Sequence, residues 1–132
     1  GEVALGCDFS RAVPALAALP KGTLLTGLDI GPTVLVTSGH SVVATAHHRA
    51  SAAIRDVIDA FLGPDEAARQ IMARRGAKMV VICPGGSEAR FYAEKAPAGF
   101  IAHLMSGKAP GWLEPVTMPA AGGVKAWRVL PR

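Results

Sequence analysis

Residues 22–49, with the sequence GTLLTGLDIGPTVLVTSGHSVVATAHHR, and residues 78–84, with the sequence KMVVICP, decide the fold. The first stretch holds two short runs of strand-forming residues, Thr23–Thr26 and Ser41–Ala46. The second is a nearly continuous apolar strand, Lys78–Cys83, closed by a proline. Two helical patterns separate the second and third strands. A strand, a helix pair and a strand form a βαβ unit, so these two strands should be parallel. The order predicts an α/β fold: a small mixed sheet with a parallel centre, helices on both faces and a C-terminal β-hairpin.

The helix pair has the clearest periodicity in the chain. The first helix begins at Ser51, and its apolar residues recur at the spacing of one helical face: Ile54, Val57, Ile58, Phe61 and Leu62. Its other side should carry an i,i+4 ion pair between Arg55 and Asp59. The second helix begins after Gly63-Pro64 and ends before Gly76, with acidic residues in its first turn and arginines in its last.

The segment 33–37 has strand-forming residues but helix-forming boundaries. Asp29 can cap a helix, Pro32 suits a first helical position, and Gly39 can follow the last. We therefore expect a short helix here. The other expected elements are a helix over Arg11–Leu19 capped by Ser10, helices over Ser87–Ala93 and Ala98–Met105, and a hairpin of Pro115–Pro119 and Val124–Leu130.

Composition limits the classes of function. The 132 residues suit one domain, and the chain has a net charge of +4. The basic residues are scattered and no aromatic platform accompanies them, so no nucleic-acid partner is expected. No apolar run reaches the roughly 18 residues that span a bilayer. Because the chain begins at Gly1 without a methionine, we expect residues 1–132 to be a single soluble domain excised from a longer membrane protein.

A histidine-rich segment offers candidate binding residues: His40, His47, His48 and Arg49. Neighbouring residues of a strand point to opposite faces, so His47 and His48 are poorly placed to ligate one metal ion. We expect no metal and no cofactor. Arg49 can hold a phosphate or carboxylate through its planar fork, or it can be a solvated arginine where the strand ends.

The loops that follow parallel strands are the usual ligand sites of α/β sheets. Asp29 lies in one such loop, where its carboxylate can accept hydrogen bonds from a ligand or cap the next helix. Another loop, Pro84–Ser87, can hold an anion at a helix N-terminus or be a plain connection. Tyr92, Trp112 and Trp127 can stack on sugar rings or pack in the core. The residues form no recognisable catalytic set, so no catalytic residue is expected in this domain.

The element order from Lys21 to Pro84 resembles the soluble C-terminal domain of bacterial membrane glycosyltransferases of the GT-C class, and of the oligosaccharyltransferase catalytic subunit in particular. The resemblance is carried by Asp29 and Gly31, by Gly39-His40, and by the segments 65–71 and 78–82. Gly27-Leu28 stands where that family has Trp-Trp in its Trp-Trp-Asp-Tyr-Gly motif, and Ile30 stands in place of the tyrosine.

The resemblance implies an extracytoplasmic domain on the periplasmic face of the inner membrane, attached to the membrane-embedded remainder of its own chain. It would help dock a glycan, peptide or lipid-linked substrate through Asp29, His40, His48 and Arg49, and would be inactive alone. Export would favour a disulfide between Cys7 and Cys83, which would otherwise be buried thiols. The alternative is a non-catalytic module that binds a small anion or a partner.

Overall fold

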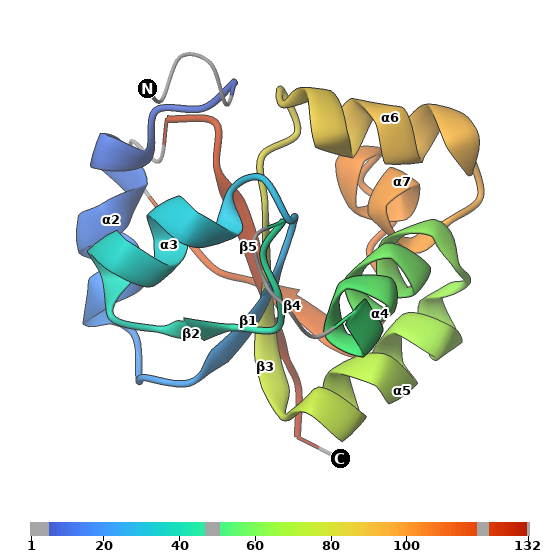
Figure 1. The fold of residues 1–132 in the computed structure, drawn as a ribbon, viewed down its shortest axis with the longest axis horizontal. Helices are drawn as coiled ribbons and strands as arrows, with labels where there is room; N and C mark the ends of the chain where they lie inside the picture. The colour runs from blue at the N-terminus through green and yellow to red at the C-terminus, as the bar shows by residue number, and fades with distance from the viewer. Residues whose placement is uncertain (1–5, 47–50, 119–121, 132) are drawn as a thin grey trace.

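A five-stranded mixed sheet forms the centre of the computed structural model, which describes residues 6–46, 51–118 and 122–131 (Figure 1). The strand order is β2-β1-β3-β5-β4. The strands are β1 (Thr23–Thr26), β2 (Ser41–Val42), β3 (Ala77–Ile82), β4 (Leu113–Pro115) and β5 (Lys125–Val129). Strand β1 is parallel to both β2 and β3, whereas β5 is antiparallel to β3 and β4. The predicted α/β class with a parallel centre is confirmed.

Helices cover both faces of this sheet, as Figure 1 shows. One face carries α2 (Phe9–Ala18) and α3 (Gly31–Ser38), and the other carries α4 (Ser51–Leu62), α5 (Asp65–Arg75), α6 (Ser87–Lys95) and α7 (Phe100–Met105). Two buried clusters fill the two layers. Successive strand residues serve opposite clusters, because side chains alternate along a strand: Leu24 packs below α2 and α3, and Leu25 packs on the side of α4.

The second strand is shorter than predicted. The prediction of Ser41–Ala46 is wrong beyond Val42, where the chain turns over the end of β1. The backbone N–H of Val43 still donates to Leu24 O (3.0 Å), but that of Ala46 donates to Leu28 O (3.3 Å) in the loop after β1. Strands β2 and β3 are parallel as predicted, although β1 lies between them.

Two local predictions fail because a neighbouring residue takes the expected role. Asp8, rather than Ser10, caps α2, since the buried Phe9 already belongs to the helix. On α4 the ion pairs involve Asp56 instead of Arg55 and Asp59: Asp56 contacts the guanidinium groups of Arg74 and Arg75 on α5 at 2.9 and 2.7 Å. The C-terminal hairpin is present, but its first strand is Leu113–Pro115, earlier in the chain than predicted.

A disulfide between Cys7 and Cys83 joins the N-terminal segment to the end of β3. The two Cα atoms are 6.0 Å apart, and 76 positions separate the cysteines in the sequence. Gly6 then passes so close to Gly85 that a Cβ on Gly6, whose φ is +87°, would lie 2.5 Å from the Gly85 carbonyl oxygen. Of the two alternatives for these cysteines, a disulfide and buried thiols, the disulfide is the one observed. None of the helices in the described ranges has both the length and the apolarity to cross a membrane.

Candidate functional site

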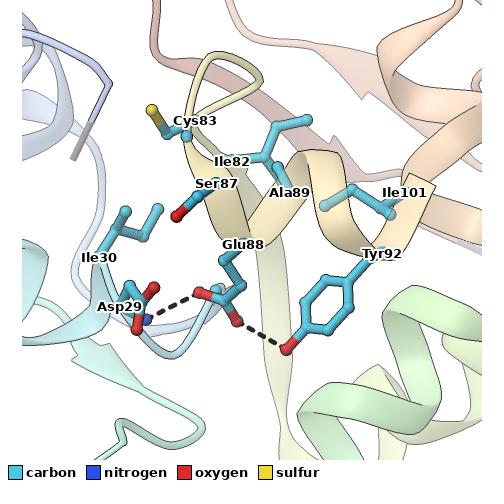
Figure 2. Close-up of a pocket in the computed structure, with 11 residues that line it drawn as sticks. Asp29, Ile30, Ile82, Cys83, Ser87, Glu88, Ala89, Tyr92 and Ile101 are labelled. Carbon is cyan, nitrogen blue, oxygen red and sulfur yellow. Dashed lines mark hydrogen bonds between the residues drawn. The ribbon is translucent and has the colours of Figure 1, made fainter. Parts of the chain in front are cut away.

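A small cavity lies where β1 and β3 end, beside the first turn of α6 (Figure 2). Its volume is about 40 Å³, room for on the order of two or three water molecules. The loop after β1 contributes Gly27, Asp29 and Ile30, and the opposite wall includes Ser87, Glu88 and Tyr92. This is the edge of the sheet where α/β folds usually place ligands, as expected from the sequence.

Glu88 holds the loop after β1 through both carboxylate oxygens. The backbone N–H of Asp29 donates to Oε1 at 2.8 Å, and the backbone N–H of Leu28 donates to Oε2 at 2.8 Å. The Tyr92 hydroxyl, one helical turn further along α6, donates to Oε2 at 2.7 Å (Figure 2). Three donors from two separate elements therefore converge on one carboxylate. Hydrogen bonds to an ionised carboxylate are stronger than those between neutral groups.

Tyr92 is kept protonated by this arrangement. Burial raises the pKa of its phenol, and the hydrogen bond and negative charge of Glu88, with the charge of Asp29, raise it further. The ring itself is buried, stacking on Phe61 and meeting Phe91 edge-on. Tyr92 is thus a core residue with a polar tip at the cavity, and the core alternative for this aromatic side chain is the one observed.

Asp29 lies at the rim of the cavity and is exposed. It does not cap α3: the N-cap residue is Ile30, and the helix N-terminus has no side-chain capping hydrogen bond. The backbone of Asp29 is tied to Glu88, yet within residues 6–46, 51–118 and 122–131 no donor group bonds to its carboxylate. Of the two alternatives for Asp29, capping is therefore wrong, and the carboxylate is open to an external donor.

His40 occupies the interior of the α2–α3 layer, with 2% of its surface exposed. Its Nε2 lies 2.6 Å from the carbonyl oxygen of Leu16, and its Nδ1 accepts the backbone N–H of Gly22 at 3.3 Å. This pattern assigns the neutral ring with the proton on Nε2. Both nitrogens are engaged within the chain, so the geometry gives His40 a structural role, joining the end of α2 to the start of β1.

His48 and Arg49, the other two predicted binding residues, lie outside the described residues, as does His47. The structure therefore brings Asp29 to the cavity and leaves those predictions untested. In the part of the chain that is described, no three His, Cys, Asp or Glu side chains are grouped so as to hold a metal ion.

Both tryptophans, Trp112 and Trp127, pack within the fold. Trp112 stacks on Phe100, with ring centroids 5.7 Å apart, and the Arg69 guanidinium lies 5.6 Å from the centroid of its ring. Trp127 is buried on β5. These positions favour core packing over sugar stacking for both side chains.

Sequence reasoning missed the role of Glu88. The sequence contains only a weak indication of this role. Glu88 lies in the first turn of a predicted helix, and Tyr92 follows four residues later on the same helical face. The partner amides of Leu28 and Asp29 lie 60 and 59 positions away, so only the adjacency of β1 and β3 reveals the contact.

This fold is shared with a class of known structures, the C-terminal globular domains of archaeal oligosaccharyltransferases. One such domain, from the AfAglB-S2 oligosaccharyltransferase of Archaeoglobus fulgidus, superposes with a TM-score of 0.69 at 16% sequence identity, covering 91% of this chain and 95% of that one. A second C-terminal globular domain of oligosaccharyltransferase from the same organism gives a TM-score of 0.53 at 17% identity, covering 89% and 85% of the two chains. Neither a protein-family model nor a curated protein sequence matches this chain. At these identities the similarity establishes the fold.

Proposed function

We propose that the chain is the extracytoplasmic soluble domain of a membrane-embedded glycosyltransferase of the oligosaccharyltransferase type. In this proposal the domain helps to dock the acceptor or the lipid-linked donor, and the catalytic groups lie elsewhere in the protein. The main support is the extent of the structural similarity, which covers 91% of this chain and 95% of an oligosaccharyltransferase C-terminal domain. Similarity over nearly the whole of both chains supports a domain with the same place in a larger enzyme.

The disulfide supports an extracytoplasmic location. Disulfides persist in the periplasm and outside the cell, whereas thiols are kept reduced in most cytosols. The Cys7–Cys83 pair also lies directly beside the candidate site, since Cys83 lines the cavity. We therefore propose that the domain lies in an oxidising compartment, such as the periplasmic side of the inner membrane.

Asp29 is the residue that we propose contacts substrate. Its carboxylate accepts hydrogen bonds only, so it would select a hydroxyl, amide or ammonium group rather than an anion. His48 and Arg49 remain part of the proposed contact surface on sequence grounds. The alternative, a module that binds a small anion at the strand ends, fits this cavity less well, because two carboxylates, Asp29 and Glu88, line it.

The test is to determine the whole coding sequence around this chain and to examine the full-length product. The proposal expects several apolar segments of about 20 residues upstream and glycan transfer by the full-length protein in membranes. A full-length protein without such segments would refute the proposal. The anion alternative predicts instead that inorganic phosphate raises the Tm of the isolated chain.

A further inference from the structure

We propose that Glu88 is a positioning residue: it fixes the loop after β1 so that the Asp29 carboxylate faces outward at the cavity. The purpose assigned to this contact rests on the proposed function, but the contact itself does not. The two ideas can therefore fail separately, and the experiment below is chosen to tell them apart.

The hydrogen bonds of Glu88 are divided between its two oxygens in a specific way. Oε1 accepts the Asp29 amide and Oε2 accepts the Tyr92 hydroxyl (Figure 2). Oε2 also accepts the Leu28 amide. Two consecutive peptide groups are thereby held on one carboxylate. This fixes the direction of the backbone at Asp29, and so the direction in which its side chain leaves the loop.

Glu88 itself stands on a rigid support. It lies in the first turn of α6, five positions after Cys83, which the disulfide ties to the N-terminal segment. Tyr92, which bonds Oε2, is anchored by its ring in the aromatic core. A loop that follows a strand is ordinarily among the more mobile parts of a fold, and the clamp couples this one to the core.

The neighbouring backbone is shaped around the Glu88 carboxylate. A Cβ on Gly27 would lie 2.7 Å from Oε1, so any side chain at that position would displace the carboxylate from the Asp29 amide. Gly27 therefore supplies the space that lets a glutamate reach the loop.

The two carboxylates at the cavity have different tasks. Three donors occupy Glu88, whereas in the described ranges the Asp29 carboxylate bonds to none. A ligand donor therefore finds free lone pairs on Asp29, while a contact to Glu88 would compete with bonds already formed. This assigns ligand contact to Asp29 and orientation to Glu88.

The experiment compares Glu88→Gln with Tyr92→Phe and Asp56→Asn by amide chemical shifts and hydrogen exchange. Glu88→Gln keeps the side-chain shape but removes the charge and presents an NH₂ group to one of the loop amides. We expect exchange of the Leu28 and Asp29 amides to rise at least tenfold relative to core amides such as Val80. Asp56→Asn is the matched control, because it weakens another multiply bonded carboxylate, between α4 and α5, and should leave both loop amides unchanged.

Tyr92→Phe provides a second and milder variant. Because the hydroxyl shares Oε2 with the Leu28 amide, its loss should shift the Leu28 resonance more than that of Asp29. Unchanged loop amides in a folded Glu88→Gln or Tyr92→Phe protein would overturn the proposal. A uniform rise in exchange across the chain would also overturn it, since that would indicate general destabilisation.

A double-mutant comparison in the full-length protein tests whether Glu88 acts through Asp29. Glu88→Gln should reduce glycan transfer in the wild-type background and cause no further loss in an Asp29→Asn background. Additive losses would contradict a positioning role. If the loop amides respond while Asp29→Asn leaves transfer unchanged, the proposed substrate contact of Asp29 fails and the positioning of the loop stands.

Discussion

We predict that removal of the Cys7–Cys83 disulfide strongly destabilises the fold. Both cysteines are buried, and the bond closes a loop across 76 positions, more than half of the 132 residues. For a loop of that length the chain-entropy relation gives a stabilisation of about 4.5 kcal/mol at 25 °C, an upper value, since measured disulfides typically contribute about 2–4 kcal/mol. At about 2.1 cal/mol/K of unfolding entropy per residue, 1 kcal/mol corresponds to about 3–4 °C in Tm for a chain of this size.

The Cys7→Ala/Cys83→Ala variant should therefore melt about 7–16 °C below the oxidised wild type. Calorimetry with and without dithiothreitol checks this: reduction should lower the Tm of the wild type to near that of the variant and leave the variant unchanged. The reasoning would be refuted by a double variant that melts within about 2 °C of the oxidised wild type.

Three further predictions concern individual side chains. Burial alone would raise the pKa of Asp56, but the Arg75 and Arg74 hydrogen bonds lower it overall. The free energy of unfolding should therefore decrease as the pH falls below about 4. Asp56→Asn should lose about 1 kcal/mol of stability at pH 7 and show a smaller decrease in acid, as measured by urea unfolding at a series of pH values. The raised pKa of Tyr92 means that stability falls above about pH 10, where the unfolded phenol ionises, and Tyr92→Phe should reduce that fall. Gly27→Ala should destabilise the fold by about 1–3 kcal/mol, because the new Cβ would clash with the Glu88 carboxylate. The control Gly22→Ala, with no atom within 4 Å of the new Cβ, should change stability by less than about 0.5 kcal/mol. Equal losses in the two variants would contradict the steric argument.

The elements with strong local signals were predictable from sequence. Helix α4 has a continuous apolar face, α5 has charges matched to both ends and a glycine after Arg75, and β3 is apolar apart from Lys78. For α3, Pro32 and Gly39 outweighed the β-branched residues between them, and Gly39 indeed adopts a φ of +75°. Here the proline and glycine at the helix boundaries, which restrict the backbone conformation, predicted the structure better than the average strand propensity of the residues between them.

The failures occurred where two neighbouring residues offered the same chemistry or where distant elements decided the outcome. Asp8 and Ser10 are both good caps, and burial of Phe9 decided between them. His40 looked like a ligand-binding side chain, but its ring lies against the end of α2, where the Leu16 carbonyl accepts the ring N–H as well as the Leu19 amide. Such choices depend on burial and on which backbone groups the fold brings within hydrogen-bond distance, which a linear pattern does not contain.

The candidate site was predictable in place but not in mechanism. The rule that ligands gather where parallel strands end led to the loop of Asp29 and to the loop before Ser87. The clamp between them needs β1 beside β3 and α6 oriented so that Glu88 faces the loop, which is a property of the assembled sheet.

The central claim is that Asp29 contacts substrate in a membrane glycosyltransferase. The most direct measurement changes the Asp29 codon to Asn in the full-length gene and quantifies, by mass spectrometry, the glycan on the cell's own acceptors. Asp59→Asn is the matched control, an exposed aspartate on α4 away from the cavity. We predict at least a tenfold loss of glycan for Asp29→Asn and wild-type levels for Asp59→Asn. Wild-type glycan levels in a stably expressed Asp29→Asn protein would contradict the account.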